Sequence, residues 1–177
     1  MKSLKQLLIN AAAATGLLLA TTFSANATLI TQDIIAGGFN IATVEIDVPD
    51  EFLGTGLIDT AFDGVPTLVS LNFFGVFPAL EIFDFQAVIN TDDLFAGIEF
   101  LAIDAIDSDG SNPWTYQIII DIFDPSFNFV DIFDANNDPV FFSADVQLSQ
   151  AQVNTPATLG LFVLAIAGVF AARMRKS

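Results

Sequence analysis

Apolar and polar side chains alternate with a period of two through most of the middle of the chain. Such alternation is typical of a β-strand that buries one face and exposes the other. It is found at residues 44–48, 69–73, 83–87, 116–122 and 142–148, with spaced phenylalanines at 127–133. Residues 97–103 are apolar on both faces apart from Glu99, which predicts a central strand. Turn-forming Gly, Pro, Asn and Asp residues separate these segments.

The spacing of these segments predicts an all-β body of about seven to nine short strands, folded as an antiparallel β-sandwich or a jelly roll. No long stretch of this part repeats with the 3.6-residue period of a helix. Two apolar segments lie outside it, and they predict an N-terminal signal helix and a C-terminal hydrophobic helix. The expected organisation is a signal peptide at residues 1–27, an acidic β domain at 28–150 and a sorting or transmembrane tail at 151–177.

The charges are separated along the chain. All 21 acidic residues lie between Asp33 and Asp145, and this stretch contains no Lys or Arg, so the β domain carries a formal charge of 0 − 21 = −21. Nucleic-acid binding depends on Lys and Arg that neutralise phosphates, so nucleic acid is excluded as a partner. The five basic side chains lie at the two ends: Lys2, Lys5, Arg173, Arg175 and Lys176.

The chain also lacks His and Cys. This excludes Ser-His and Cys-His catalysis, thiolate redox chemistry and the usual zinc ligands. Without cysteine no disulfide can stabilise the fold, so burial of apolar side chains must do so.

The N-terminus has the three parts of a secretory signal peptide. Lys2 and Lys5 form a positive region, residues 7–20 are largely apolar, and Ala25-Asn26-Ala27 is a small-x-small cleavage site for signal peptidase. The alternative is an uncleaved N-terminal anchor, although the apolar stretch is shorter than the ~20 residues of a membrane-spanning helix.

The C-terminus combines an apolar run with a basic end. Residues 159–172 are apolar and precede Arg173, Arg175 and Lys176. Counted from Ala157, the run is just long enough for a thin bilayer and short for a permanent span, and the positive-inside rule keeps the basic cluster on the cytoplasmic side. The β domain is therefore expected to face outward, held transiently or permanently by a C-terminal transmembrane segment.

A short Pro-containing motif, a hydrophobic helix that starts with Thr-Leu, and a basic last turn together resemble the PEP-CTERM sorting signal. The resemblance begins at Val153, and the family's Pro-Glu-Pro triplet is replaced here by Asn154, Thr155 and Pro156. It implies a Gram-negative cell with an exopolysaccharide or biofilm matrix, and processing by an exosortase-like membrane enzyme. The alternative is a single-pass anchor that is never cut.

Two acidic clusters have oxygen-rich spacing that would suit Ca²⁺. The first is Asp104, Asp107, Asp109 and Asn112, and the second is Asp134, Asn136 and Asp138. Neither is an EF-hand, because the downstream bidentate Glu is missing. The same sequences are common in solvated turns, which is the alternative interpretation.

Aromatic residues raise a further possibility. Most of the 19 phenylalanines are expected in the core, but four fall in turns or off the inward register: Phe74, Phe77, Phe123 and Phe141. They would suit either a carbohydrate-facing surface or a second packed face. Trp114 and Tyr116, beside the first acidic cluster, would suit stacking on a sugar or plain packing.

The sequence favours a non-enzymatic, exported protein of the cell envelope or extracellular matrix. A carbohydrate-binding or adhesive module is the first alternative, with extracellular polysaccharide as its partner. The second alternative is a carboxylate-dependent hydrolase: Asp59-Thr60-Ala61 resembles an aspartic-protease triplet, but a second copy is absent.

Overall fold

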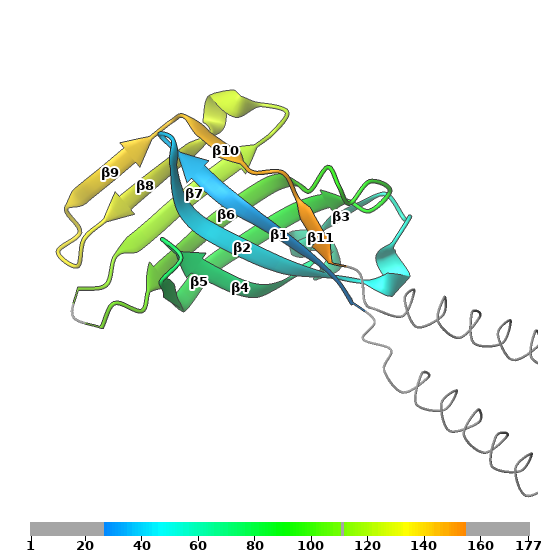
Figure 1. Ribbon diagram of the computed structural model, residues 1–177, viewed down its shortest axis with the longest axis horizontal. Coiled ribbons are helices and arrows are strands. Elements are labelled where there is room, and N and C mark those ends of the chain that lie inside the picture. Colours follow the sequence, from blue (N-terminus) through cyan, green and yellow to red (C-terminus); the bar gives the residue numbers. More distant parts are fainter. Residues whose placement is uncertain (1–26, 111, 155–177) are drawn as a thin grey trace, which may run out of the picture. The chain divides into compact units, whose positions relative to one another are not determined.

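The computed structural model describes residues 27–110 and 112–154, and this part of the chain is built mainly from antiparallel strands (Figure 1). One short α-helix and two 3₁₀ turns accompany them within these residues. The elements are β1 (Ala27–Ala36), β2 (Phe39–Pro49), η1 (Asp50–Phe52), β3 (Leu57–Asp59), α2 (Thr60–Asp63), β4 (Thr67–Phe73), β5 (Phe77–Asn90), β6 (Ile98–Asp107), β7 (Thr115–Asp121), η2 (Pro125–Phe127), β8 (Phe129–Phe133), β9 (Pro139–Ser143), β10 (Val146–Leu148) and β11 (Gln152–Asn154).

The predicted antiparallel all-β class is confirmed. Every strand pair is antiparallel, and the strands follow one hydrogen-bonded path, β10-β1-β2-β4-β5-β6-β7-β8-β9, with β11 paired to β1 and β3 to β5. The sheet curls until it nearly closes on itself, whereas a sandwich or jelly roll has two sheets. The 14-residue β5 explains the single path, because it pairs with β4 at its start and with β6 along its length.

One hydrophobic core fills the inside of the curled sheet. Inward positions of β1, β2, β6, β7 and β8 contribute Ile, Val, Leu and Ala side chains, and Phe73 and Tyr116 are the largest fully buried ones. The two rings stack, with centroids 3.6 Å apart and planes inclined by 10°. The predicted central strand is confirmed, since β6 lies between β5 and β7.

A buried amide ties the two halves of the sheet together. Gln32 of β1 is 3 % exposed, accepts a hydrogen bond from the backbone N–H of Ile98 (2.7 Å) and donates to the carbonyl of Ser149 (2.7 Å). The side chain fits only because residue 97 is glycine: a Cβ there would lie 2.5 Å from Gln32 Oε1, and the φ of +83° also favours glycine.

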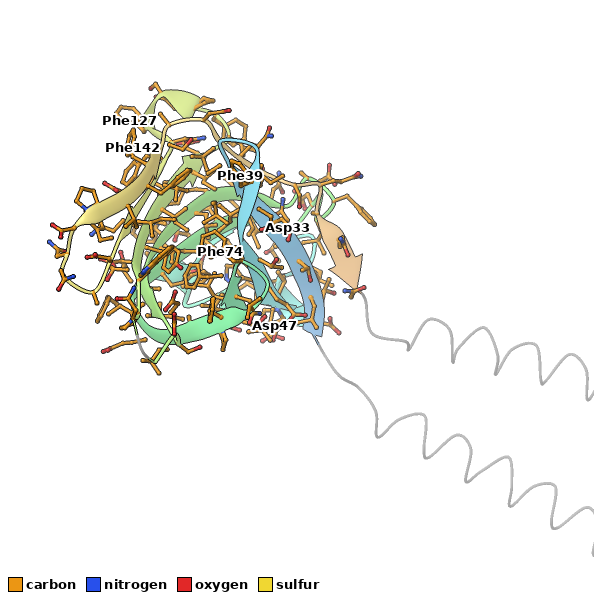
Figure 2. The ribbon with its side chains drawn as sticks, turned by 60° about the vertical axis from the view of Figure 1, so that its left-hand side comes forward. Asp33, Phe39, Asp47, Phe74, Phe127 and Phe142 are labelled. Atoms are coloured by element: carbon orange, nitrogen blue, oxygen red, sulfur yellow. The ribbon has the colours of Figure 1, made fainter. Side chains whose placement is uncertain are left out.

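One predicted strand is wrong in detail. Residues 142–148 were expected to form a single strand with Phe142 and Ala144 inward, but the chain breaks into β9 and β10. Ser143 is buried and its hydroxyl bonds the backbone of Asp145, while Phe142 is 64 % exposed and projects outward (Figure 2). The reason is a change of partner, because β9 pairs with β8 and β10 pairs with β1.

The sheet also extends past the predicted boundary at residue 150. Gln152, Val153 and Asn154 form β11 and pair with Thr31, Ile30 and Leu29 of β1. The first residues of the expected tail therefore belong to the β domain. Both predicted terminal helices lie outside the described residues. Among the described residues, no helix has the length and apolar character needed to cross a membrane.

Candidate ligand-binding site at one end of the sheet

Four strand connections meet at the same end of the sheet. The antiparallel register sets Ala36 against Phe39, Phe73 against Phe77, Ile106 against Thr115, and Phe133 against Pro139. The β1–β2, β4–β5, β6–β7 and β8–β9 connections therefore all open at this end, while the β5–β6 and β7–β8 connections lie at the other.

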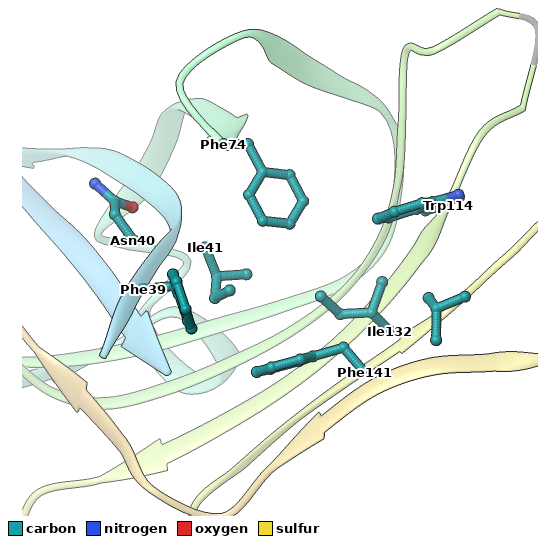
Figure 3. A pocket seen from close by; sticks show the side chains of 8 residues that line it. Phe39, Asn40, Ile41, Phe74, Trp114, Ile132 and Phe141 are labelled. Atoms are coloured by element: carbon teal, nitrogen blue, oxygen red, sulfur yellow. The ribbon is translucent and has the colours of Figure 1, made fainter. Parts of the chain in front are cut away.

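A pocket of about 380 Å³ opens between these connections, and we call it the aromatic pocket. Its lining is almost entirely apolar, with Asn40 as the polar exception. The lining residues are Phe39, Asn40, Ile41, Phe74, Trp114, Ile132, Val140 and Phe141. Figure 3 shows Ile41, Phe74, Trp114, Ile132 and Phe141, which come from separate segments, around one space. Phe39 is 68 % and Phe74 40 % exposed, so ring faces are available to a ligand.

A second pocket of about 360 Å³ shares a wall with the first, and we call it the acidic pocket. Phe74 and Trp114 line both pockets and meet edge to face, with ring centroids 6.3 Å apart and an interplanar angle of 86°. The remaining lining residues are Phe77, Asp107, Asp109, Asn112 and Tyr116. The end of the sheet thus places aromatic rings next to carboxylate and amide oxygens.

Asp107 organises the loop that carries Trp114. Its side chain is 2 % exposed, and one carboxylate oxygen accepts hydrogen bonds from the backbone N–H groups of Asp109 (3.1 Å) and Trp114 (3.2 Å). The other oxygen accepts from the Tyr116 hydroxyl at 2.8 Å. Burial raises the pKa of Tyr116, and the hydrogen bond and negative charge of Asp107 raise this pKa further, so Tyr116 is a neutral donor.

Tyr116 has no exposed ring face for a sugar. It is 0 % exposed and stacked on Phe73, so of the two candidate stacking residues only Trp114 is available to a ligand.

The structure does not bring the first predicted calcium cluster together. Asp104 and Asp107 are three residues apart in β6, so their side chains point to opposite faces, and the buried Asp107 points inward. Asp107, Asp109 and Asn112 do line one pocket. Within the described residues no group of three or more acidic side chains is placed to hold a metal ion. Calcium binding stays a prediction.

The second predicted calcium cluster forms the β8–β9 turn. One carboxylate oxygen of Asp134 accepts hydrogen bonds from the backbone N–H groups of Asn136 (2.8 Å) and Asp138 (3.0 Å). The Asn136 amide lies 3.5 Å from the other oxygen. These contacts are those of a self-satisfied turn, which supports the alternative interpretation of this segment.

Asp59, the residue of the protease-like triplet, acts as a helix cap. Its carboxylate accepts the backbone N–H of Ala61 at 2.8 Å and the side-chain amide of Gln86 at 3.0 Å. Both interactions are structural, since they begin α2 and fasten it to β5.

The sequence pointed to part of the pocket. Phe74 and Phe141, which fall off the inward register, line the aromatic pocket, and Phe77 lines the acidic one. Phe123 is 75 % exposed and lies in neither pocket. Phe39 and Asn40 were missed; the only signal was the Gly37-Gly38 turn that precedes them.

The processing residues are mostly beyond what the structure describes. Ala25, Thr155, Pro156, Arg173, Arg175 and Lys176 lie outside the described residues, as do Lys2 and Lys5. Ala27 is the first residue of β1 and Asn154 the last of β11.

The backbone of Phe74 adopts an unfavourable conformation in the turn between β4 and β5. Its φ is +50°, and Gly75, with a φ of +70°, follows it in the turn closed by the hydrogen bond from Val76 N–H to the Phe73 carbonyl (3.0 Å). Asn-Gly is the preferred sequence where both central φ angles are positive, and a bulky residue there is an outlier. Such outliers cluster at ligand-binding sites.

We therefore expect Phe74→Asn to be more stable than Phe74→Ala by about 1 kcal/mol, because both lose the ring and only Asn tolerates positive φ well. Urea unfolding of the two variants measures the difference. Equal stability, or a more stable alanine variant, would contradict the assigned strain.

A second prediction concerns Asp134. The backbone hydrogen bonds from Asp138 and Asn136 hold the pKa of its carboxyl below the ordinary 3.8. Because the folded pKa is below the unfolded one, the stabilisation is present above pH 3.8 and is lost as the pH falls through the folded value. Carboxyl NMR titration should show this low pKa, and Asp134→Asn should flatten the acid-side loss of stability. A titration at or above 3.8 would contradict it.

No protein-family model, no curated protein and no solved structure matches the chain.

Proposed function

We propose that this chain is an exported, non-enzymatic protein of the bacterial cell envelope or extracellular matrix, and that its β domain binds a glycan in the aromatic pocket. The observation that carries the proposal is the convergence of Phe39, Phe74, Trp114 and Phe141 at one end of the sheet, beside the acidic pocket. The scaffold is one curled sheet, whose two halves face each other across a shared core.

The chemistry of the pocket suits a sugar. A pyranose ring presents an apolar C–H face that packs on an aromatic ring, while its hydroxyls need polar partners at the rim. Asn40 supplies such a partner in the aromatic pocket, and Asp109 and Asn112 supply others in the acidic pocket. Ligand pockets usually combine a mostly apolar lining with a few polar groups in this way.

The charge of the domain limits the class of glycan that it can bind. With no Lys, Arg or His between residues 27 and 154 and a formal charge of −21, the domain repels anions. Sulfated and uronic-acid polysaccharides are therefore poor candidates, and the proposed glycan carries no negative charge.

The two ends of the chain support export. The proposed partners there are signal peptidase, acting after Ala27, and an exosortase-like membrane enzyme, acting at the tail. Removal or retention of the tail decides whether the β domain is released or stays attached to the membrane.

Glycan binding is tested by Trp114→Ala. Loss of the shared aromatic wall should weaken binding to uncharged oligosaccharides about tenfold, as expected for one stacked ring. Isothermal calorimetry measures the affinity. Phe95→Ala is the matched control, because Phe95 is 71 % exposed in the β5–β6 connection at the opposite end of the sheet.

Equal binding by the Trp114 and Phe95 variants would contradict the proposed site. Turnover of a glycan that a single Asp→Asn change abolishes would instead favour the carboxylate-dependent hydrolase.

Export is tested by fractionation and mass spectrometry of the mature ends. The full chain should begin at Thr28 and associate with the envelope, whereas a chain that ends at Asn154 should be released. The structure sets this truncation point, because a chain that ends at Gln150 would lose β11 and its pairing with β1. Identical partitioning of the full chain and the Asn154 version would refute a sorting role for the tail.

A further inference from the structure

The long strand β5 lacks a neighbour along the middle of one of its two edges. One edge pairs with β6 along most of its length. The other edge pairs with β4 at Phe77 and Pro78 and with β3 at residues 88–90. Within the described part of the chain, no strand pairs with this second edge between residues 79 and 86. We call residues 79–86 the open edge of β5.

Apolar side chains are exposed along the open edge. Leu80 and Phe83 are exposed, and each is the extra residue of a β-bulge where the register with β6 shifts. Ile82 lies opposite the buried Ala105 of β6, so it faces the core side, yet it is 41 % exposed. Farther along the same face, where β3 covers the edge, Ile89 is 0 % exposed. The exposure of Ile82 therefore follows from the missing neighbour.

The outer face of the open edge is acidic. Glu81 and Asp84 are exposed, and they pair with Ile106 and Asp104, which lie two residues apart on the outer face of β6. Asp84 and Asp104 are thus like charges directly opposite each other, an arrangement that destabilises a sheet. One carboxylate oxygen of Asp104 is buried without a hydrogen-bond partner in the described structure. A basic side chain on the free side of Asp84 would offset this repulsion.

We propose that the open edge binds an extended peptide segment of another protein, in which basic and apolar residues alternate. Added as a strand, this segment places its basic side chains on the outer face, beside Glu81 and Asp84. Its apolar side chains then lie on the inner face, beside Ile82, because successive residues of a strand point to opposite faces. The open edge is about 26 Å long, which suits a segment of about eight residues.

Charge complementarity selects this occupant over a second copy of the β domain. Residues 27–154 contain no Lys, Arg or His and carry a formal charge of −21, so two copies would set carboxylates against carboxylates. A basic segment is instead attracted by the field of the whole domain. The proposal is independent of glycan binding, since no residue of the open edge lines the aromatic pocket or the acidic pocket.

The test uses a labelled synthetic peptide of four Val-Lys repeats with blocked ends. Fluorescence anisotropy with the full-length protein measures its affinity at low ionic strength. An N-methylated version of the peptide keeps the side chains and the charge but lacks the backbone N–H groups, so it should bind at least tenfold more weakly. A peptide of Val-Glu repeats should not bind.

Two matched variants test the position of the peptide. Glu81→Gln removes one charge from the outer face of the open edge and should weaken binding of the Val-Lys peptide about threefold, as expected for an exposed ion pair. Asp93→Asn removes one charge from the exposed β5–β6 connection and should leave the affinity unchanged. In the unaltered protein, hydrogen exchange should become slower at the amides of residues 79–86 when the peptide is added.

Three results would overturn the proposal. Equal binding of the Val-Lys peptide and its N-methylated version would show a general attraction of a polycation to an acidic protein. Equal losses in Glu81→Gln and Asp93→Asn, or unchanged exchange at residues 79–86, would place the peptide elsewhere. Dimerisation of the protein alone, with slowed exchange at residues 79–86, would make a second copy the occupant. None of these results bears on glycan binding in the aromatic pocket, which Trp114→Ala tests separately.

Discussion

The structure of the β domain depends on how 21 carboxylates are accommodated without one cationic side chain between residues 27 and 154. Ion pairs are impossible there, so neutral donors must stabilise the carboxylates. Backbone N–H groups at turns do most of this, as at Asp121 and Asp134, and hydroxyls and amides do the rest, as Thr43 does for Asp33. Hydrogen bonds to a charged acceptor are stronger than neutral ones, which makes this solution workable.

Three carboxylates on the outer face of the sheet are not fully hydrogen-bonded. Asp47, Asp104 and Asp131 each keep one buried carboxylate oxygen without a hydrogen-bond partner in the described structure. Burial, together with the nearby charge of Asp50, raises the pKa of Asp47. Because unpartnered buried oxygens cost free energy, these positions oppose folding, and the continuous apolar core must offset them. Neutral amides such as Gln32 then close the sheet without adding charge.

The same constraint shapes the site. Acidic residues can be tolerated near Trp114 only because Asp107 is held by three neutral donors, and those bonds also fix the loop that presents the indole ring. The same hydrogen bonds therefore stabilise the Asp107 carboxylate and position Trp114. Phe74 completes the aromatic wall in an unfavourable backbone conformation. At this position a side chain that suits the proposed ligand therefore costs the fold some stability.

Local patterns in the sequence determined the antiparallel strands, the central place of β6 and the purely acidic character of the β domain, because hydrophobic alternation and charge are properties of individual residues. Only the tertiary structure decided which connections meet, since the register between distant strands brings Phe39 beside Phe74 and Trp114. It also placed Asp104 and Asp107 on opposite faces of β6, buried Tyr116, and divided the strand predicted at residues 142–148 into β9 and β10. The physical reason is that a period of two assigns a side chain to one of two faces, whereas curling and partner exchange decide what each face contacts.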